Sequence, residues 1–135
     1  MNIQAVADTL AVSADTLRYW ERVGVIPPVP RTAAGYRTYG PAELDWCNFA
    51  KCMRNAGVSI EALCDYIALY QAGPQTAAAR KQLLQTQLTV IAARLQAVQG
   101  TYDRLAAKIE HYDEADLNPF AHHTQNTQGG TIQHV

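Results

Sequence analysis

The stretch from residue 16 to residue 44, TLRYWERVGVIPPVPRTAAGYRTYGPAEL, decides how this chain folds. Its two ends are compatible with helices, but the middle, from Gly24 to Gly40, contains three prolines and three glycines. Proline removes a backbone donor and glycine commonly ends helices, so residues 24–40 are predicted to be non-helical. Within them, residues 36–39 (Tyr-Arg-Thr-Tyr) are predicted to form a short strand after a turn at Gly35. Pro41 is then well suited to the first position of a new helix.

Two short helices separated by a tight turn are predicted before Gly24. Apolar residues recur at helical spacing over residues 2–10, and Ser13 is a favourable N-cap for a second helix over residues 14–23. These are the proportions of a helix-turn-helix, whose second helix enters the major groove of DNA. The segment therefore suggests nucleic-acid binding, although spacing alone fits an ordinary solvated helix equally well.

The second helix has two chemically different faces at 100° per residue. Leu17 and Trp20 lie on the apolar side, where Trp20 is predicted to belong to the core. The opposite face carries Asp15, Arg18, Tyr19 and Arg22. Arginine binds guanine edges or phosphates and tyrosine donates to phosphates, so this face is the candidate contact with DNA.

The second half of the chain is dominated by one long amphipathic pattern. A third helix is predicted from Pro41 to about Ala56 and a fourth from Ser59 to the Gly73-Pro74 step. Apolar residues then alternate in steps of four and three at Leu84, Leu88, Ile91, Leu95, Val98, Tyr102, Leu105, Ile109 and Tyr112. Extended back to Ala77, such a helix is about 54 Å long and cannot bury this seam alone, so a partner helix is expected.

The motifs of residues 16–44 resemble those of the MerR family of bacterial transcription regulators. Residues 16–21 (TLRYWE) match the family's first block and residues 24–28 (GVIPP) its second. Arg31 followed by residues 35–39 (GYRTY) matches the third block, and an acidic residue near the start of the next helix completes the pattern. Ala11 differs from the family, which often has glycine at that turn. The resemblance spans residues 2 to about 72 at the level of motifs, and to about 112 at the level of architecture.

The resemblance implies a mainly α fold, with a winged helix-turn-helix followed by a long helix that dimerises as an antiparallel coiled coil. The expected domains are residues 1–73 for DNA binding, 74–115 for dimerisation and 116–135 as a flexible tail. The homodimer is expected to distort double-stranded promoter DNA so that RNA polymerase holoenzyme reads it correctly. The residues expected to contact DNA are Ser13, Thr16, Arg18 and Tyr19, with Arg31, Tyr36, Arg37 and Tyr39 from the wing (residues 31–39). Turn packing is an equally good explanation of Tyr36.

Composition is compatible with this interpretation but does not itself indicate nucleic acid. The chain has 135 residues, of which 48% are hydrophobic and 17% charged, with a net charge of −1, so one packed domain is expected. Residues 1–58 carry a net +1 and the remainder −2, which is only a weak asymmetry. No long apolar run and no signal-peptide pattern occur, so a cytoplasmic protein without a membrane partner is expected.

Cysteine chemistry is the leading candidate for how such a regulator would sense its signal, with the histidines near the end of the long helix as a second route. The three cysteines are Cys47, Cys52 and Cys64, with none beyond, which disfavours a soft-metal site after the long helix. Lys51-Cys52-Met53-Arg54 resembles the aldehyde- and thiol-stress subgroup of the family, and neighbouring cations lower a thiol pKa. Cys52 is therefore the candidate sensor, with packing as the alternative, whereas Cys47 and Cys64 are predicted to pack in the core.

Two other functions compete with that of a DNA-binding regulator. A coiled-coil scaffold would bind protein rather than DNA, and its association would lack the steep salt dependence of phosphate contacts. An enzyme is not expected, because no nucleophile–base pair, paired carboxylates or phosphate loop are visible. No cofactor or metal is expected either, since the histidines and acids at 111, 113, 116, 122 and 123 have irregular spacing for zinc or nickel.

Overall fold

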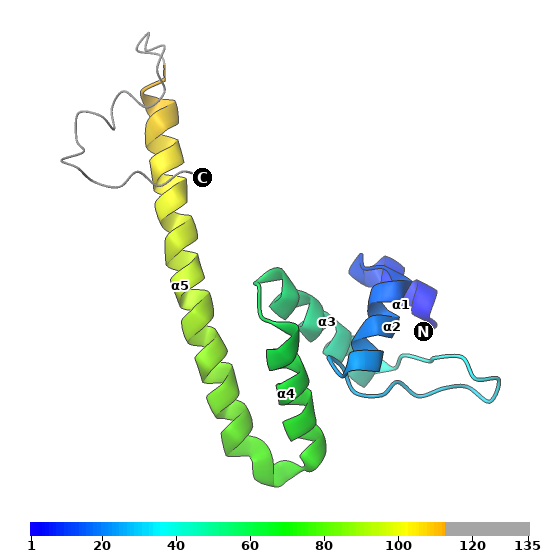
Figure 1. Cartoon of the computed structure of the whole chain (residues 1–135). Coiled ribbons are helices and arrows are strands. Elements are labelled where there is room, and N and C mark those ends of the chain that lie inside the picture. The colour runs from blue at the N-terminus through cyan, green and yellow to red at the C-terminus, as the bar shows by residue number, and fades with distance from the viewer. Residues whose placement is uncertain (113–135) are drawn as a thin grey trace. The chain divides into compact units, whose positions relative to one another are not determined.

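The computed structural model describes residues 1–112 and is helical through most of this length (Figure 1). The helices are α1 (Ile3–Leu10), α2 (Ala14–Val23), α3 (Pro41–Asn55), α4 (Ile60–Ala72), the 3-10 turn η1 (Pro74–Thr76) and α5 (Ala77–Glu110). The chain forms two compact units, residues 1–92 and a second that begins at Ala93. The predicted tail, residues 116–135, and the acidic and histidine positions after Tyr112 lie outside the described residues.

Side-chain caps define the start of the first two helices. The Asn2 side-chain oxygen accepts from the Ala5 backbone N–H at 2.8 Å, a cap that the sequence analysis did not identify. Ser13 caps α2 as predicted, because its hydroxyl accepts from the Thr16 N–H at 3.0 Å. Gly24 then ends α2 in the left-handed conformation, with φ of +94°. Local sequence chemistry therefore sets the bounds of α2.

The core of the first unit lies where α1, α2, α3 and α4 meet the segment after Gly24. Leu17 and Trp20 bury the inner face of α2, so Trp20 belongs to the core as predicted, and Cys47 contributes from α3. The other buried residues of this cluster are Val6, Ala7, Val25, Ile26, Val29, Tyr39, Ala50, Val58 and Leu63. This packing leaves the Arg18 face of α2 exposed to solvent.

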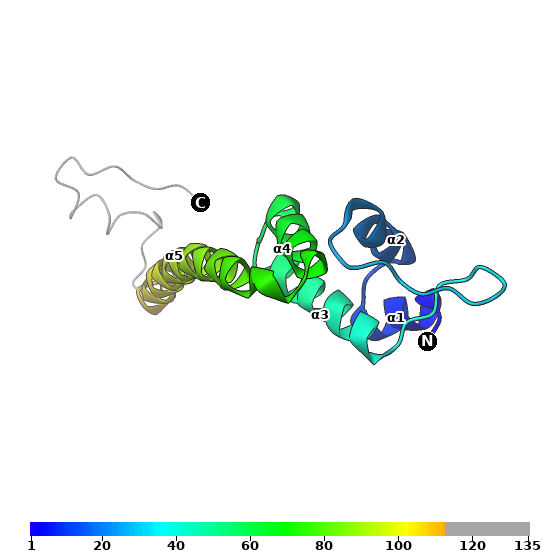
Figure 2. The ribbon, with the colours of Figure 1, turned by 90° about the horizontal axis from the view of Figure 1, so that it is seen from below.

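The wing is a tight hairpin-like loop rather than the short strand that we predicted. Among the described residues, its pairing is a single antiparallel bridge between Arg31 and Arg37. The Thr32 N–H donates to the Tyr36 carbonyl at 2.7 Å, and Gly35 makes the turn with φ of +90°. Figures 1 and 2 show this segment extending beyond α1 and α2. Since only one bridge forms, residues 36–39 do not make a ladder.

The apolar seam of α5 remains largely on the surface. Seam residues from Leu95 to Tyr112 are exposed, and Leu95 itself is 68% exposed. Ile91 differs because it is half-buried and packs against the core of the first unit. No helix within residues 1–112 is long and apolar enough to cross a membrane.

Ala11, between α1 and α2, is strained in a way that a substitution can relieve. Its φ of 55° and ψ of 44° place it in the left-handed region, where residues that carry a Cβ are disfavoured and glycine is not. We expect Ala11→Gly to raise the free energy of unfolding by about 1 kcal/mol. Thermal or urea unfolding measures this change, with Ala14→Gly at the start of α2 as a control that should destabilise. An Ala11→Gly protein that unfolds more readily than the parent would contradict the assignment of strain.

Candidate nucleic-acid interface

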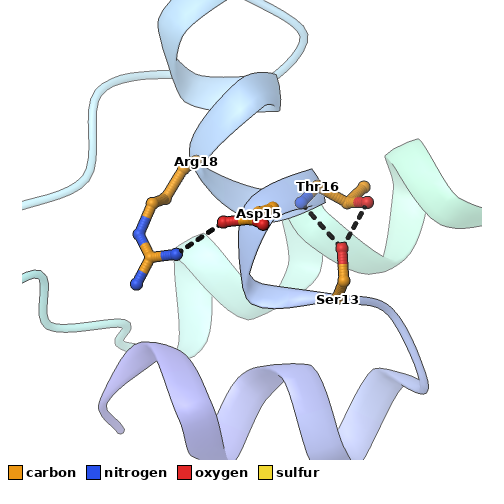
Figure 3. Close-up of polar contacts among 4 residues, drawn as sticks. All are labelled: Ser13, Asp15, Thr16 and Arg18. Carbon is orange, nitrogen blue, oxygen red and sulfur yellow. Dashed lines mark hydrogen bonds and ion pairs between the residues drawn. The ribbon is translucent and has the colours of Figure 1, made fainter.

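The start of α2 presents a compact polar surface (Figure 3). The Ser13 hydroxyl accepts from the Thr16 backbone and lies 2.8 Å from the Thr16 hydroxyl, so both hydroxyls are engaged in capping the helix. One turn further on, Arg18 Nη1 donates to the Asp15 carboxylate at 2.9 Å. The Arg18 side chain is 48% exposed, and this ion pair is open to water. Such an exposed pair is weak, so the guanidinium can exchange Asp15 for another acceptor at small cost.

The outer face of α2 continues with an aromatic residue and a second arginine. The guanidinium of Arg22 lies 5.3 Å from the centre of the Tyr19 ring, within cation–π distance, and both residues are exposed. This contact holds the Tyr19 ring on the solvent side of the helix. Arg22 was placed on this face by the sequence analysis but was not among the predicted DNA contacts.

A shallow groove of about 620 Å³ joins α2 to the wing. It collects four of the predicted site residues, Arg18, Arg31, Tyr36 and Arg37, although they are up to 19 positions apart in sequence. Its other lining residues are Met1, Asn2, Ile3, Thr32, Gly35 and Thr38. Three guanidinium groups, together with amide and hydroxyl donors, make this a surface for anionic oxygens such as those of phosphate. Ser13, Thr16 and Tyr19 lie outside the groove, on α2.

Glu21 connects α2 to the wing, and the sequence analysis did not recognise its role. One carboxylate oxygen accepts from the Arg37 Nε, and the other accepts from the Val29 backbone N–H at 2.8 Å. The Glu21 and Arg37 side chains are only 13% and 19% exposed. Arg37 is thus committed to an internal ion pair at its Nε, whereas Arg31 is exposed and donates to the Gly35 carbonyl at 3.0 Å. An acidic residue at the end of a recognition helix, followed by an arginine-containing turn, is the signal that could have revealed it.

The charges around Glu21 outweigh the cost of burying its carboxylate. Burial alone would raise the pKa of Glu21. The hydrogen bonds from Val29 and Arg37, with the positive charges of Arg37 and Arg31, together lower the pKa below its ordinary value of 4.5. The ionised carboxylate is therefore the form that the folded wing requires.

Tyr39, which was also predicted to contact DNA, has a buried side chain in this structure. The residue is 1% exposed, and its hydroxyl has no hydrogen-bond partner among the described residues. Burial, followed by the proximity of Cys47, raises the pKa of Tyr39. Its backbone N–H donates to the Met1 carbonyl at 2.7 Å, so Tyr39 packs the end of the wing against the start of the chain. Tyr36, in contrast, is 72% exposed at the wing.

The three cysteines occupy three different environments. Cys47 is fully buried, as predicted, and burial raises the pKa of its thiol to about 11. Cys64 is partly buried, packs against the core and donates to the Val23 carbonyl at 3.2 Å. Its burial raises the pKa of the thiol, and the nearby carboxylates of Asp65 and Glu61 raise it further. Cys52 is exposed on α3. Within residues 1–112, no three His, Cys, Asp or Glu residues gather in a way that could hold a metal ion.

A helix-turn-helix with an exposed arginine face, flanked by a wing, defines this molecule as a DNA-binding protein of the winged helix-turn-helix class. The model of the MerR helix-turn-helix regulatory family matches residues 1–69, and the model of the MerR DNA-binding region matches residues 44–108. The chain therefore belongs to the MerR family of transcription regulators. The resemblance to the MerR family and the mainly α fold with a long C-terminal helix are thereby confirmed, and this family consists of transcription regulators rather than enzymes.

Curated relatives match this chain over part of their own length. The chain is 52% identical over 84 residues to the HTH-type transcriptional regulator AdhR of Bacillus subtilis. The aligned region covers 62% of this chain and 60% of AdhR. It is 37% identical over 71 residues to heavy metal-dependent transcription regulator 2 of Rhizobium meliloti, covering 53% of this chain and 48% of that protein. The chain thus spans about half to three fifths of the length of these relatives.

Solved structures extend the similarity over most of the chain. A MerR family transcriptional regulator from Listeria monocytogenes is 42% identical, with a TM-score of 0.81 and coverage of 93% of this chain and 95% of that one. HiNmlR, a MerR family regulator lacking the sensor domain and bound to promoter DNA, has a TM-score of 0.78 at 24% identity. The match covers 84% of this chain and 90% of the HiNmlR chain. At this level of identity the similarity supports the fold alone.

The role of Glu21 predicts a pH-dependent stability that one substitution removes. We expect Glu21→Gln to lower the free energy of unfolding by roughly 1–3 kcal/mol near neutral pH, because the half-buried Arg37 loses its counter-charge. Since folding lowers the pKa of Glu21, its contribution is complete above pH 4.5 and is lost as the pH falls through the folded-state pKa. Unfolding measured between pH 3 and 7 should therefore show parent and variant converging only at the acid end. A constant difference across that range would contradict the assignment. Glu61→Gln, an exposed change on α4, is the control.

Proposed function

We propose that this chain acts in the cytoplasm as a homodimer that binds promoter DNA through α2 and the wing and distorts it in response to an electrophile sensed at Cys52. The groove that unites Arg18 of α2 with Arg31, Tyr36 and Arg37 of the wing is the observation that carries the proposal. It aligns a helix suited to the major groove with donors suited to the adjoining phosphates. A pure protein-interaction module would have no need for this arrangement of cations.

The two parts of the interface are proposed to have different tasks. Arg18 and Tyr19, exposed on α2, contact base edges and neighbouring phosphates, with Ser13 and Thr16 at the helix start close to the backbone. Arg31 and Tyr36 contact phosphates from the wing, and Arg37 contributes positive charge while holding the wing to Glu21. HiNmlR, which has this fold and whose crystal structure contains bound promoter DNA, is consistent with DNA binding by such a fold, whereas the roles of the individual residues rest on the groove described here.

The homodimer is proposed because α5 leaves an apolar seam without cover in one chain. Leu95, Val98, Tyr102, Leu105 and Ile109 are each more than half exposed, although they recur at the spacing of a coiled coil. Two antiparallel copies of α5 would cover both seams and hold two DNA-binding units at a fixed spacing. A fixed spacing allows the dimer to bend or untwist the promoter between its half-sites, so that RNA polymerase can engage it.

Cys52 is proposed as the sensor because it combines exposure with a cationic neighbourhood in sequence. Lys51 precedes it, and Arg54 donates to the Val58 carbonyl across the end of α3. The buried Cys47 is unsuited to reaction, and burial and nearby acids disfavour the thiolate of Cys64. Alkylation or oxidation of the Cys52 thiolate would add bulk at α3, between the wing and α4.

Arg18→Ala tests the proposed DNA interface after the operator has been recovered by sequencing DNA captured with the protein. We expect the variant to lose about 1–3 kcal/mol of operator binding and most of its preference over random DNA. Arg31→Ala, at the exposed arginine of the wing, should weaken binding to both DNAs and reduce the salt dependence by about one phosphate contact. Tyr39→Phe is the matched control and should bind as the parent does, because the hydroxyl is buried. Parallel losses on operator and random DNA for Arg18→Ala would contradict base reading, and unfolding curves would separate loss of fold from loss of contact.

Leu95→Asp tests the homodimer. A charge at this seam position has no counter-charge in an apolar interface, so we expect sedimentation to show a monomer where the parent is a dimer. Gln82→Asp, on the exposed surface of α5 outside the seam, should leave the dimer intact. A Leu95→Asp protein that remains fully dimeric would exclude the seam as the interface.

Cys52→Ser tests the sensor in a reporter driven by the native operator under aldehyde and disulfide stress. We expect it to abolish induction while operator affinity in vitro stays unchanged. Cys64→Ser and Cys47→Ala should still respond, and Cys47→Ala avoids placing a hydroxyl in the core. Normal induction in Cys52→Ser would show that the signal enters elsewhere.

A further inference from the structure

Eight of the nine seam residues of α5, from Leu84 to Ile109, are placed symmetrically about one point. Leu84 lies as many residues before the midpoint between Gln96 and Ala97 as Ile109 lies after it. The same holds for Leu88 with Leu105, for Ile91 with Tyr102, and for Leu95 with Val98. An antiparallel pair of identical helices reverses residue order about its two-fold axis. The eight seam residues from Leu84 to Ile109 can therefore each lie opposite an apolar residue of a second copy, whereas Tyr112 lies opposite Lys81.

We propose that two copies of α5 pair antiparallel with the two-fold axis between Gln96 and Ala97, and that Arg94 sets this register. The inference rests on the homodimer proposed above and specifies how its interface is aligned. Leu95 then lies opposite Val98 of the second copy at the centre, and Leu84 lies opposite Ile109 at the ends. Eight seam residues of each chain are covered, including seven that are exposed in one chain and the half-buried Ile91.

Sliding one helix along the other by one seven-residue repeat keeps apolar residues opposite each other over most of the seam. The two registers produced in this way are the alternatives to the proposed register. Displacement toward Tyr112 also matches eight seam residues, with Leu88 opposite Tyr112 and Leu95 opposite Leu105 of the second copy. It leaves Leu84 beyond the last apolar residue of the other seam. Displacement in the opposite direction places Leu105 opposite Lys81 and leaves the end of the seam unmatched. Burial of apolar surface therefore narrows the choice to two registers without deciding between them.

The polar positions that border the seam decide between these two registers. On one border lie Gln87, Arg94, Thr101 and Lys108, and in an antiparallel pair this border meets its own copy. In the proposed register Arg94 adjoins Thr101 of the second copy and Gln87 adjoins Lys108. In the register displaced toward Tyr112, Arg94 adjoins Lys108 of the second copy at two symmetric places. Displacement the other way sets Arg94 beside its own copy.

The positions that border the opposite side of the seam carry no charge that would favour another register. That border consists of Gln85, Ala92, Gln99 and Ala106, which are uncharged. Like charges facing each other across a helical interface repel. In the symmetric dimer the repulsion between Arg94 and Lys108 would occur twice, and that between the two copies of Arg94 once. Arg94 thus disfavours both displaced registers while meeting a neutral threonine in the proposed one. Reversing its charge should favour the register that brings position 94 beside Lys108.

Disulfide trapping between introduced cysteines tests the register in the full chain. The background is Cys52→Ser with Cys64→Ser, retaining the buried Cys47, and each variant is first shown by sedimentation under reducing conditions to be a dimer. Under mild oxidation we expect L88C/L105C to form a covalent dimer in high yield and L88C/Y112C to remain mostly uncrosslinked. Adding Arg94→Glu should shift the yield from the first pair toward the second. Arg94→Gln, which removes the repulsion without adding an attraction to Lys108, should give a smaller shift in the same direction.

A second measurement leaves the seam intact. Thr89 is exposed on α5 outside the seam, so Thr89→Cys provides a site for a spin label. The two labels of the dimer should be separated along the helix axis by about 22 Å in the proposed register. In the register displaced toward Tyr112 the separation should be about 33 Å. A distance near 33 Å, or crosslinking of L88C/Y112C in place of L88C/L105C, would overturn the register. Crosslinking of L88C alone would indicate parallel helices and overturn it as well. A monomeric parent chain would instead refute the proposed homodimer, so the two failures are distinguishable.

Discussion

The carboxylate of Glu21 is the constraint on which the proposed DNA-binding surface of this molecule depends. It lies at the end of α2 and accepts from both Val29 and Arg37, so it ties the helix to both sides of the wing. The wing has only one backbone bridge of its own among the described residues and packs few side chains. Without an ionised Glu21, the wing would lose its side-chain link to α2, and Arg37 would be held less firmly relative to Arg18. The proposed interface is therefore positioned from within, by a residue that need not touch DNA.

A second constraint acts on α5, and it concerns apolar surface. A helix of 34 residues with an exposed stripe of leucine, valine, isoleucine and tyrosine is unfavourable in water unless something covers it. The first unit covers part of it at Ile91, and the remainder is available to a second chain. A dimer formed through this stripe would couple two DNA-binding units mechanically. That coupling would allow a small change at α3 to alter how both units meet a promoter.

The distribution of cysteines separates structure from reactivity. Cys47 lies in the core, where its thiol is held neutral, and Cys64 donates to the Val23 carbonyl at the end of α2. Cys52 is exposed to reagents from solvent, on the helix that follows the wing. The exposed thiol of Cys52 thus lies on an element that helps to position the DNA-facing surface. This placement, rather than the presence of a cysteine by itself, is the reason for proposing Cys52 as the sensor.

The sequence by itself determined the features that depend on neighbouring residues. Ser13 and Gly24 bound α2, Pro41 starts α3, and the four-three spacing defines the face of α5, because caps, breakers and periodicity act over a few residues. The motifs around Arg18 and Tyr36 were sufficient to identify the family. Only the tertiary structure decided which side chains face inward. Tyr39 carries the same motif signal as Tyr36 but is buried against the core, and Arg37 is committed to Glu21, which lies 16 positions earlier. Burial and ion pairing are set by segments distant in sequence that pack together, and no local pattern records which of two similar residues will meet them.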